Sequence, residues 1–208
     1  KEKKFTNLAN LLVSLEKVNP EAFEEIVIER LDSQDSIKAN LNSALIALMA
    51  LDSYVTSRQN SNSEQDVVLL QKLAPPVAVF SRRVAREETN DEDLIVLFVF
   101  SALKFLKKCA ENDTQNLAAN KIAAMFTIAI ETIGNEKMVT EASILSNAAV
   151  RELPLASRQA VLGMDSSTRL KFKTLLDYSV FTTQVRAKNN DDFTEIKTPG
   201  KIALTAFQ

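Results

Sequence analysis

The sequence contains only three glycines in 208 residues. Soluble proteins use glycine at roughly 7% of positions, so the shortage is large. β-Hairpins, dinucleotide-binding turns and phosphate-binding loops need glycine where the backbone takes a positive φ. Neither GxGxxG nor GxxxxGK followed by Ser or Thr occurs. Because apolar residues also recur every three to four positions along almost the whole chain, the sequence predicts an all-α fold.

Polar and turn-forming residues divide this pattern into successive segments. Breaks fall near residues 19, 34, 60, 90, 113, 135, 154 and 164. Asn19-Pro20 suits a helix cap followed by the first helical position, and Gly134-Asn135 suits a helix end. The segments between the breaks predict helices in consecutive pairs with short connections, about four pairs in all.

Local rules also make predictions for individual segments. Pro75-Pro76 should kink or split the helix expected over 64–86, because the prolines supply no amide hydrogen. The run 112–114 should open the following helix. The segment 94–106 is apolar nearly all round, so it should be buried between neighbours. In the first segment, one apolar stripe should face the core: Phe5, Leu8, Leu12, Leu15 and Val18.

The chain has no histidine and a single cysteine, Cys109. These counts exclude Ser-His-Asp, Cys-His and His–metal chemistry within this chain, and they exclude a thiolate zinc site. We therefore expect no cofactor, no metal, no catalytic residue and no enzymatic activity. One thiol cannot form an internal disulfide, which fits a reducing compartment and predicts a cytoplasmic protein.

Two interpretations of Cys109 are open at this stage. The preceding residues are Lys107 and Lys108, and their charges could lower the pKa of the thiol. The alternative is a small apolar residue near the end of a buried helix, which is the usual situation of a free cysteine.

The charge balance and hydropathy limit the kinds of partner. The formal net charge of −2 argues against a dedicated nucleic-acid binder, because phosphate neutralisation needs a basic surface. The most apolar run, 94–103, is about ten residues long, whereas a membrane span needs about 20. We expect other proteins as partners, no nucleic acid and no transmembrane segment. The sequence leaves the oligomeric state open.

Residues 23–51 resemble a HEAT repeat, which is two helices joined by a short turn. The HEAT pattern favours an Asp in the turn and an aliphatic–basic pair just after it, and Asp35 and Ile37-Lys38 match these positions. Later pairs keep an acidic turn residue such as Asp113 but lack the basic residue. Two helices with their turns take roughly 40–47 residues, which is the period of such arrays. The resemblance implies a right-handed α–α superhelix, a HEAT-like solenoid of about four helical pairs.

The last segments resemble the end of the very large HEAT-repeat proteins that accompany clathrin adaptors. Residues 158–162, 164–167 and 169–176 have the appearance of the short aliphatic helix, turn and amphipathic capping helix that close those solenoids. This resemblance implies a non-enzymatic adaptor or scaffold in membrane traffic. It also implies that the chain, which begins without methionine, is the C-terminal segment of a larger protein.

A microtubule-regulating, tubulin-binding HEAT domain is the alternative function. Domains of that type present basic and aromatic residues on successive turns along one edge. The turns near 32–36, 90–93 and 112–114 are acidic or neutral, which disfavours this alternative.

Two basic clusters are candidate interaction residues: Arg82, Arg83 and Arg86, and then Lys104, Lys107 and Lys108. Together they could form a groove for acidic peptides or lipid headgroups. The alternative is a solvated face on which the arginines pair with the acidic run at 87–93.

The C-terminal residues carry a third candidate. Asp191, Asp192 and Phe193 form an acidic–aromatic peptide of the type that adaptor appendage domains bind. Alternatively, this stretch is an unattached terminus. The predicted organisation is thus a HEAT-like solenoid over 1–187 and a partly ordered or docked tail over 188–208. Its predicted function is to hold an extended peptide or helix of another protein in a concave groove.

Overall fold

The computed structural model describes residues 2–32, 37–57, 64–86, 92–113 and 117–189. Within these ranges every regular element is an α-helix, and no strand is present. The helices are α1 (Glu2–Val18), α2 (Pro20–Asp32), α3 (Ile37–Ser57), α4 (Glu64–Ala85), α5 (Glu92–Glu111), α6 (Ala118–Glu131), α7 (Glu136–Glu152), α8 (Pro154–Leu162) and α9 (Ser166–Asn189). The prediction of an all-α chain is confirmed. After α1, three consecutive pairs of described helices pack together, α2 with α3, α4 with α5 and α6 with α7, whereas α8 and α9 each pack on α6 and α7.

Local capping chemistry sets several of the helix boundaries. Asn19 accepts a hydrogen bond from the amide of Ala22 at 3.1 Å, so it caps α2 as expected. Asp165 does the same for α9, with the amide of Thr168 at 2.9 Å. Gly134 has a φ of 104°, a conformation that costs glycine little and lets the chain turn from α6 into α7.

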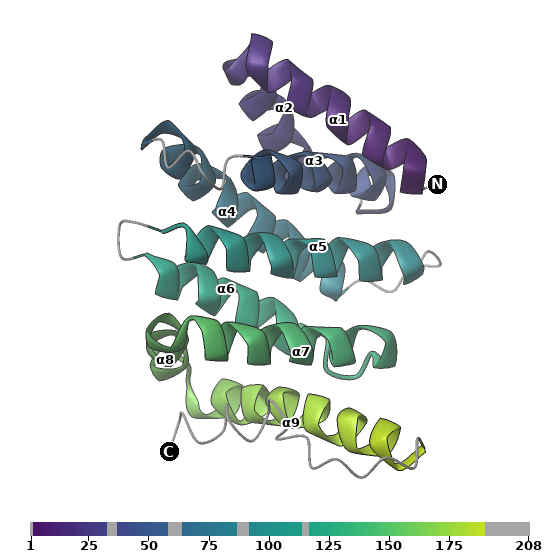
Figure 1. The fold of residues 1–208 in the computed structure, drawn as a ribbon, viewed down its shortest axis with the longest axis vertical. Helices are drawn as coiled ribbons and strands as arrows, with labels where there is room; N and C mark the ends of the chain where they lie inside the picture. Colours follow the sequence, from purple (N-terminus) through teal and green to yellow (C-terminus); the bar gives the residue numbers. More distant parts are fainter. Residues whose placement is uncertain (1, 33–36, 58–63, 87–91, 114–116, 190–208) are drawn as a thin grey trace.

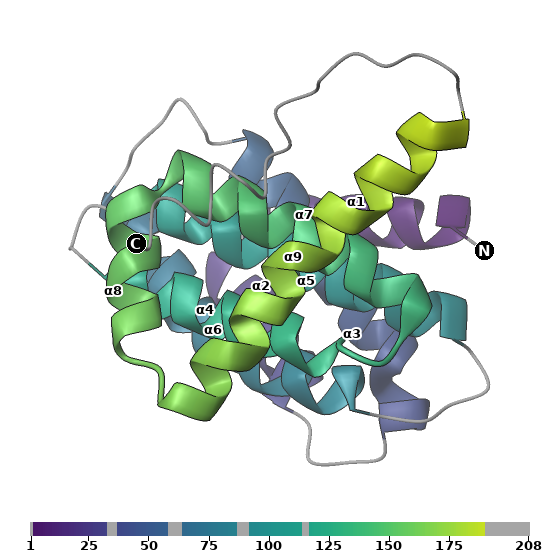
Figure 2. The same ribbon diagram turned by 90° about the horizontal axis from the view of Figure 1, so that it is seen from below.

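The helices are arranged in two layers (Figure 1). In one layer α1, α3, α5, α7 and α9 follow each other, and each packs on the next. In the other layer α2, α4, α6 and α8 do the same behind them. Seen from below in Figure 2, α9 lies across the end of the stack and α8 stands at its side. Each interior helix therefore buries its apolar surface against neighbours two elements away as well as against its hairpin partner.

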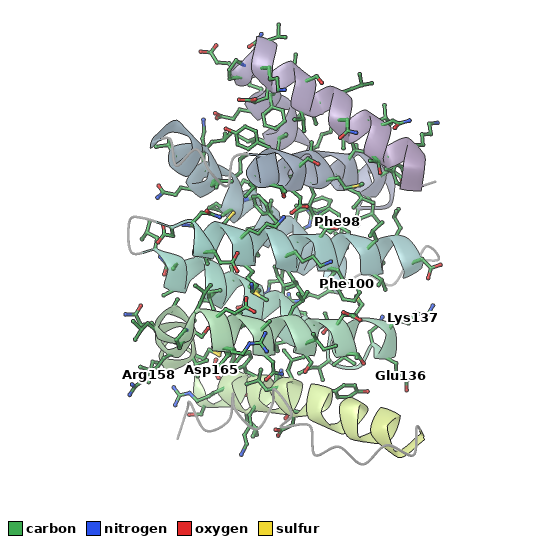
Figure 3. All side chains as sticks on the ribbon, viewed as in Figure 1. Phe98, Phe100, Glu136, Lys137, Arg158 and Asp165 are labelled. Atoms are coloured by element: carbon green, nitrogen blue, oxygen red, sulfur yellow. The ribbon has the colours of Figure 1, made fainter. Side chains whose placement is uncertain are left out.

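Aromatic pairs join the two layers at successive levels. Each pair links an even-numbered helix to an odd-numbered one: Phe23 with Tyr54, Phe80 with Phe98, and Phe126 with Phe172, with ring centroids 5.8, 5.4 and 4.2 Å apart. Tilted or edge-on rings at these separations are favourable arrangements. Phe98 on α5 is fully buried, whereas Phe100 on the same helix is half-buried (Figure 3). The core is thus one continuous apolar layer between the two rows of helices.

The contact between α7 and α9 is partly polar. The hydroxyl of Ser143 donates to the carbonyl oxygen of Leu175 at 2.6 Å, and the amide of Asn147 donates to that of Leu176 at 3.2 Å. Both donors are buried on α7. Buried donors need partners of this kind, so these bonds help to fix where α9 lies on α7.

Three sequence predictions need correction. α4 is continuous across Pro75-Pro76, so the helix is not split there, and the kink stays a prediction. α6 starts at Ala118, later than the predicted start at 112–114. Leu8 and Val18 are 39% and 84% exposed and do not face the core. The last helix, α9, extends to Asn189, and the division into a solenoid over 1–187 and a tail over 188–208 stays a prediction.

The reasons are physical. An amphipathic helix flanked by α2, α5 and α6 keeps enough packed surface to continue through two prolines, although their missing amides leave carbonyls of the preceding turn without helical donors. In α1, Phe5, Ala9, Leu12 and Val13 face the core, so only part of the predicted stripe packs there.

In the part of the chain that the structure describes, no helix combines the length and apolar character needed to cross a membrane.

The cap of α7 can be tested by substitution. The side-chain oxygen of Asn135 accepts hydrogen bonds from the amides of Lys137 and Met138 at 3.1 and 3.2 Å. Asn135→Ala should lower the free energy of unfolding by about 1 kcal/mol in urea denaturation. Asn10→Ala, at an exposed position within α1, is the control and should leave stability unchanged or slightly raised. Equal losses in both variants would contradict the capping role.

Candidate functional site

Arg82 and Arg83 of the first basic cluster lie in the last turn of α4, and Arg86 directly follows the helix. Arg82 Nε lies 3.3 Å from Glu131 Oε1, and the guanidinium of Arg86 bonds the same carboxylate oxygen. The guanidinium of Arg83 lies 5.9 Å from the centre of the Phe80 ring, a cation–π distance. Two of the arginines thus bind a carboxylate on α6. Most of the acidic run at 87–93, which the alternative interpretation proposed as their partner, lies outside the described residues.

The three lysines of the second cluster lie near the end of α5. Lys108 Nζ lies 2.6 Å from Asp52 Oδ1 on α3. Lys107 forms ion pairs with Glu111 and with Glu152 at the end of α7. Burial disfavours the charge of Lys107, but these two carboxylates outweigh it and raise the pKa of Lys107. Lys104 is exposed and forms no ion pair with a described residue.

The six basic residues do not form one groove. α4 and α5 are consecutive packed helices joined by a short connection, so the end of α4 lies near the start of α5. Lys108 is 16 residues past Glu92, which places it about 24 Å along the axis from that start. The two clusters therefore lie at opposite ends of the helix pair.

Most of these charges instead connect helices within a layer. Ion pairs link α2 to α4 through Glu24 and Lys72, α4 to α6 through Glu131, α3 to α5 through Asp52, and α5 to α7 through Glu152. Exposed pairs of this kind contribute only ~0–1 kcal/mol each. Their contribution here is to favour the observed register of neighbouring helices.

A cleft with a volume of about 770 Å³ opens on the even-numbered layer. One face of α6 forms its floor, with Ala119, Ala123, Thr127 and Ile130 at helical spacing. The end of α4 forms one wall, and α8 with the start of α9 forms the other. Figure 3 places Asp165 beside α8, at the turn into α9. Because Ala119, Ala123 and Thr127 are small, an incoming segment can approach the α6 backbone closely beside them.

The charged residues around the cleft are mixed in sign. Arg82, Arg86 and Lys171 contribute three positive charges, and Glu131 and Asp165 contribute two negative charges. The hydrogen bond from Arg86 is the main cause of the lowered pKa of Glu131, and Arg82 adds to it. The hydroxyl and amide of Thr168 lower the pKa of Asp165. Both carboxylates thus have protein partners, whereas among the described residues Arg82 and Arg86 pair with Glu131 alone and Lys171 forms no ion pair.

A second hollow, with a volume of about 370 Å³, adjoins Pro75 on α4. It is largely apolar, and it is lined by Ala74, Pro75, Ala78, Val79, Leu106, Leu117 and Ala124, together with Gln71, Asn120 and Lys121. The side-chain nitrogen of Gln71 is buried there without a hydrogen-bond partner among the described residues. The backbone carbonyl of Gln71 also lacks the usual helical donor, because that donor would be the amide of Pro75.

Asn120 lines both hollows, so they adjoin each other on α6: the larger one extends from Ala119 to Glu131, and the smaller one lies beside the first turns of the helix. We call this combined surface the α6 trough. Only Arg82 and Arg86 of the predicted basic residues belong to it. The small residues at 119, 123 and 127, each four positions apart, were the sequence signal for the floor, but they were hidden among the larger apolar residues of the same helix.

A buried ion pair stabilises the chain at the start of α6. Lys121 Nζ lies 2.8 Å from Asp113 Oδ1, and the two side chains are 8% and 0% exposed. The carboxylate also accepts a hydrogen bond from the amide of Leu117, so Asp113 still orders the entry to α6. The positive charge of Lys121 is thereby neutralised beneath the α6 trough.

The remaining sequence candidates have simple outcomes. Cys109 is buried, and burial raises the pKa of its thiol to about 12, against the smaller opposite effect of Lys121 and Lys108. The thiol is therefore protonated at neutral pH, as a core residue would be.

No group of three or more Asp, Glu, Cys or His side chains that could hold a metal occurs within the described ranges. Asp191, Asp192 and Phe193 lie outside the described residues.

No protein-family model, curated protein or solved structure matches this chain.

The buried ion pair leads to a stability prediction. Asp113→Asn leaves the ammonium group of Lys121 buried without its counter-charge, which should lower the free energy of unfolding by roughly 3–5 kcal/mol. Asp177→Asn, on the exposed face of α9, is the control and should change it by less than about 0.5 kcal/mol. Urea denaturation of both variants measures the difference, and equal stabilities would show that the pair is not buried in solution.

Proposed function

We propose that this chain is a non-enzymatic scaffold that binds an extended or helical segment of another protein in the α6 trough. The observation that carries the proposal is a pair of hollows that adjoin at Asn120 on α6, with the small side chains of Ala119, Ala123 and Thr127 on the floor of the larger one. Concave sites of several hundred Å³ are where proteins commonly hold ligands. An elongated one suits a peptide better than a compact small molecule.

The architecture behind this proposal is an α–α solenoid of the right-handed, HEAT-like type. The two-layer arrangement supports it, because each helix packs on the helix two positions later in the chain. Arrays built this way expose long surfaces that suit binding of macromolecules. The narrower predictions of an adaptor in membrane traffic, or of tubulin binding, rest on the sequence resemblance alone.

The chemistry of the trough describes the segment that would fit. Apolar side chains would enter the hollow beside Pro75, where the lining is almost entirely aliphatic. A carboxylate of the segment would face Arg82, Arg86 and Lys171 at the other end. Charge-assisted hydrogen bonds from guanidinium groups fix both position and orientation. The proposed ligand is therefore a short peptide with an apolar part and an acidic part.

A displayed library of random 12-residue peptides can test this function without knowledge of the natural partner. Selection against the 208-residue chain should enrich peptides that combine aliphatic and acidic residues. Ala123→Trp, which fills the cleft floor, should weaken their binding at least about tenfold in fluorescence anisotropy. Arg86→Glu should also weaken it, because it reverses a charge beside the ligand.

Matched controls keep the test specific. Ala22→Trp introduces the same side chain at a half-buried position of α2, and Lys173→Glu introduces the same charge on α9 outside the trough. Both should leave binding unchanged. Selected peptides that bind the Ala123→Trp variant as tightly as the unaltered chain would contradict the proposal.

A further inference from the structure

α1 carries a second apolar stripe that points away from the core. Leu8, Leu11 and Val18 are 39%, 67% and 84% exposed, and Leu15 lies between them on the same face. The core-facing side of the helix is formed by other residues, including Ala9 and Leu12. At 100° per residue, the stripe lies about 120° around the helix from that side. Such a row of large aliphatic side chains on one exposed face is typical of an interaction surface.

The two ends of the stack differ in this respect. Within the odd-numbered layer, α3, α5 and α7 each contact two helices, whereas α1 contacts one, α3. At the other end, the outward face of α9 carries Lys173, Thr174 and Asp177, with Leu170 as its one large aliphatic residue among the described side chains. The part of α9 whose side chains are described, up to Tyr178, thus has a mainly polar outward face, and α1 does not. Stacking of α1 on α9 of another molecule would leave the aliphatic stripe poorly matched.

The spacing of the stripe suits pairing with itself. The intervals between Leu8, Leu11, Leu15 and Val18 are three, four and three residues, which is the spacing of a coiled-coil seam. These intervals read the same in both directions. In an antiparallel pair of α1 helices, Leu11 would therefore lie beside Leu15 of the second copy, and Leu8 beside its Val18. Every large side chain of the stripe would be covered.

The charges at the two ends of the stripe support the same pairing. Lys4 lies one turn before Leu8, and Glu21 lies just after Val18 at the start of α2. In the antiparallel register, Lys4 of one copy comes beside Glu21 of the other. Both side chains are exposed, and neither forms an ion pair with a described residue of its own chain. Opposite charges placed in this way favour the register and the partner.

We propose that this chain forms a two-fold symmetric dimer in which α1 packs antiparallel on α1 of a second copy. A symmetric interface of this kind needs one self-complementary patch, which the stripe supplies. One helix pair is small beside the ~1,200–2,000 Å² that stable complexes bury, so the dissociation constant should be micromolar. The surface is separate from the α6 trough, and the dimer does not depend on peptide binding there.

Sedimentation velocity of the 208-residue chain, from about 1 µM to about 200 µM, measures this association. The unaltered chain should shift from monomer to dimer across the range. Leu11→Glu should keep it monomeric throughout. Leu170→Glu is a matched control, because Leu170 on α9 is 66% exposed, close to the 67% of Leu11; this variant should dimerise normally. Circular dichroism melts should show both variants folded.

A charge exchange tests the register independently of the apolar stripe. Lys4→Glu alone and Glu21→Lys alone should each weaken the dimer about threefold to tenfold, because like charges then meet at both ends of the seam. The doubly exchanged chain should recover the original dissociation constant.

A chain that stays monomeric at every concentration would overturn the proposal and leave the stripe to a helix of another protein or of a longer chain. A dimer that tolerates Leu11→Glu would overturn it as well.

Discussion

The interior helices bury apolar surface on more than one side, and no single partner can cover them. α5 is the clearest case: Phe98, Val99, Ala102, Leu103, Phe105 and Leu106 are all fully buried. A helix of this kind needs neighbours on both sides and in the second layer, and here they are α3, α7, α4 and α6. Removing one such phenylalanine typically costs 3–5 kcal/mol. The stacked arrangement follows from this requirement, and the ion pairs between neighbouring helices refine it.

The same constraint leaves the two candidate surfaces open. α6 is covered by α5, α7 and the helices of its own layer, but its outer face carries small residues between the ends of α4 and α8, and these form the floor of the trough. α1 has no helix beyond it among the described residues, so its second apolar stripe faces solvent. Both surfaces are positions where a helix of the stack presents a face that no described helix covers. A helix or peptide bound at either surface would therefore pack on the chain in the way that its own helices pack on one another.

Local rules predicted the fold well, because caps, prolines and glycines act within one or two turns. Asn19 and Gly134 mark helix boundaries where the sequence placed them. Tertiary contacts overrode local rules in α4, which continues through Pro75-Pro76. The separation of the stripe of α1 into a core side and an exposed side could not be predicted either, since it depends on where α3 lies.

The candidate sites were less predictable, because they depend on pairings between distant segments. The sequence identified Arg82 and Arg86 as basic and exposed, but Glu131, their partner, is more than 40 residues away. Lys107 and Lys108 likewise pair with carboxylates on other helices. The trough is assembled from α4, α6, α8 and α9, so no single stretch of sequence contains it.

Native-state hydrogen exchange, resolved helix by helix with mass spectrometry, tests most directly whether the helices form one stack in which each depends on its neighbours. In such a stack, stability is shared between adjacent elements and falls toward the ends. We predict the slowest amide exchange in α5 and α6, with faster exchange toward α1 at one end and α9 at the other. Equal protection in all helices, or protection of α1 and α9 as strong as that of α5, would contradict this arrangement.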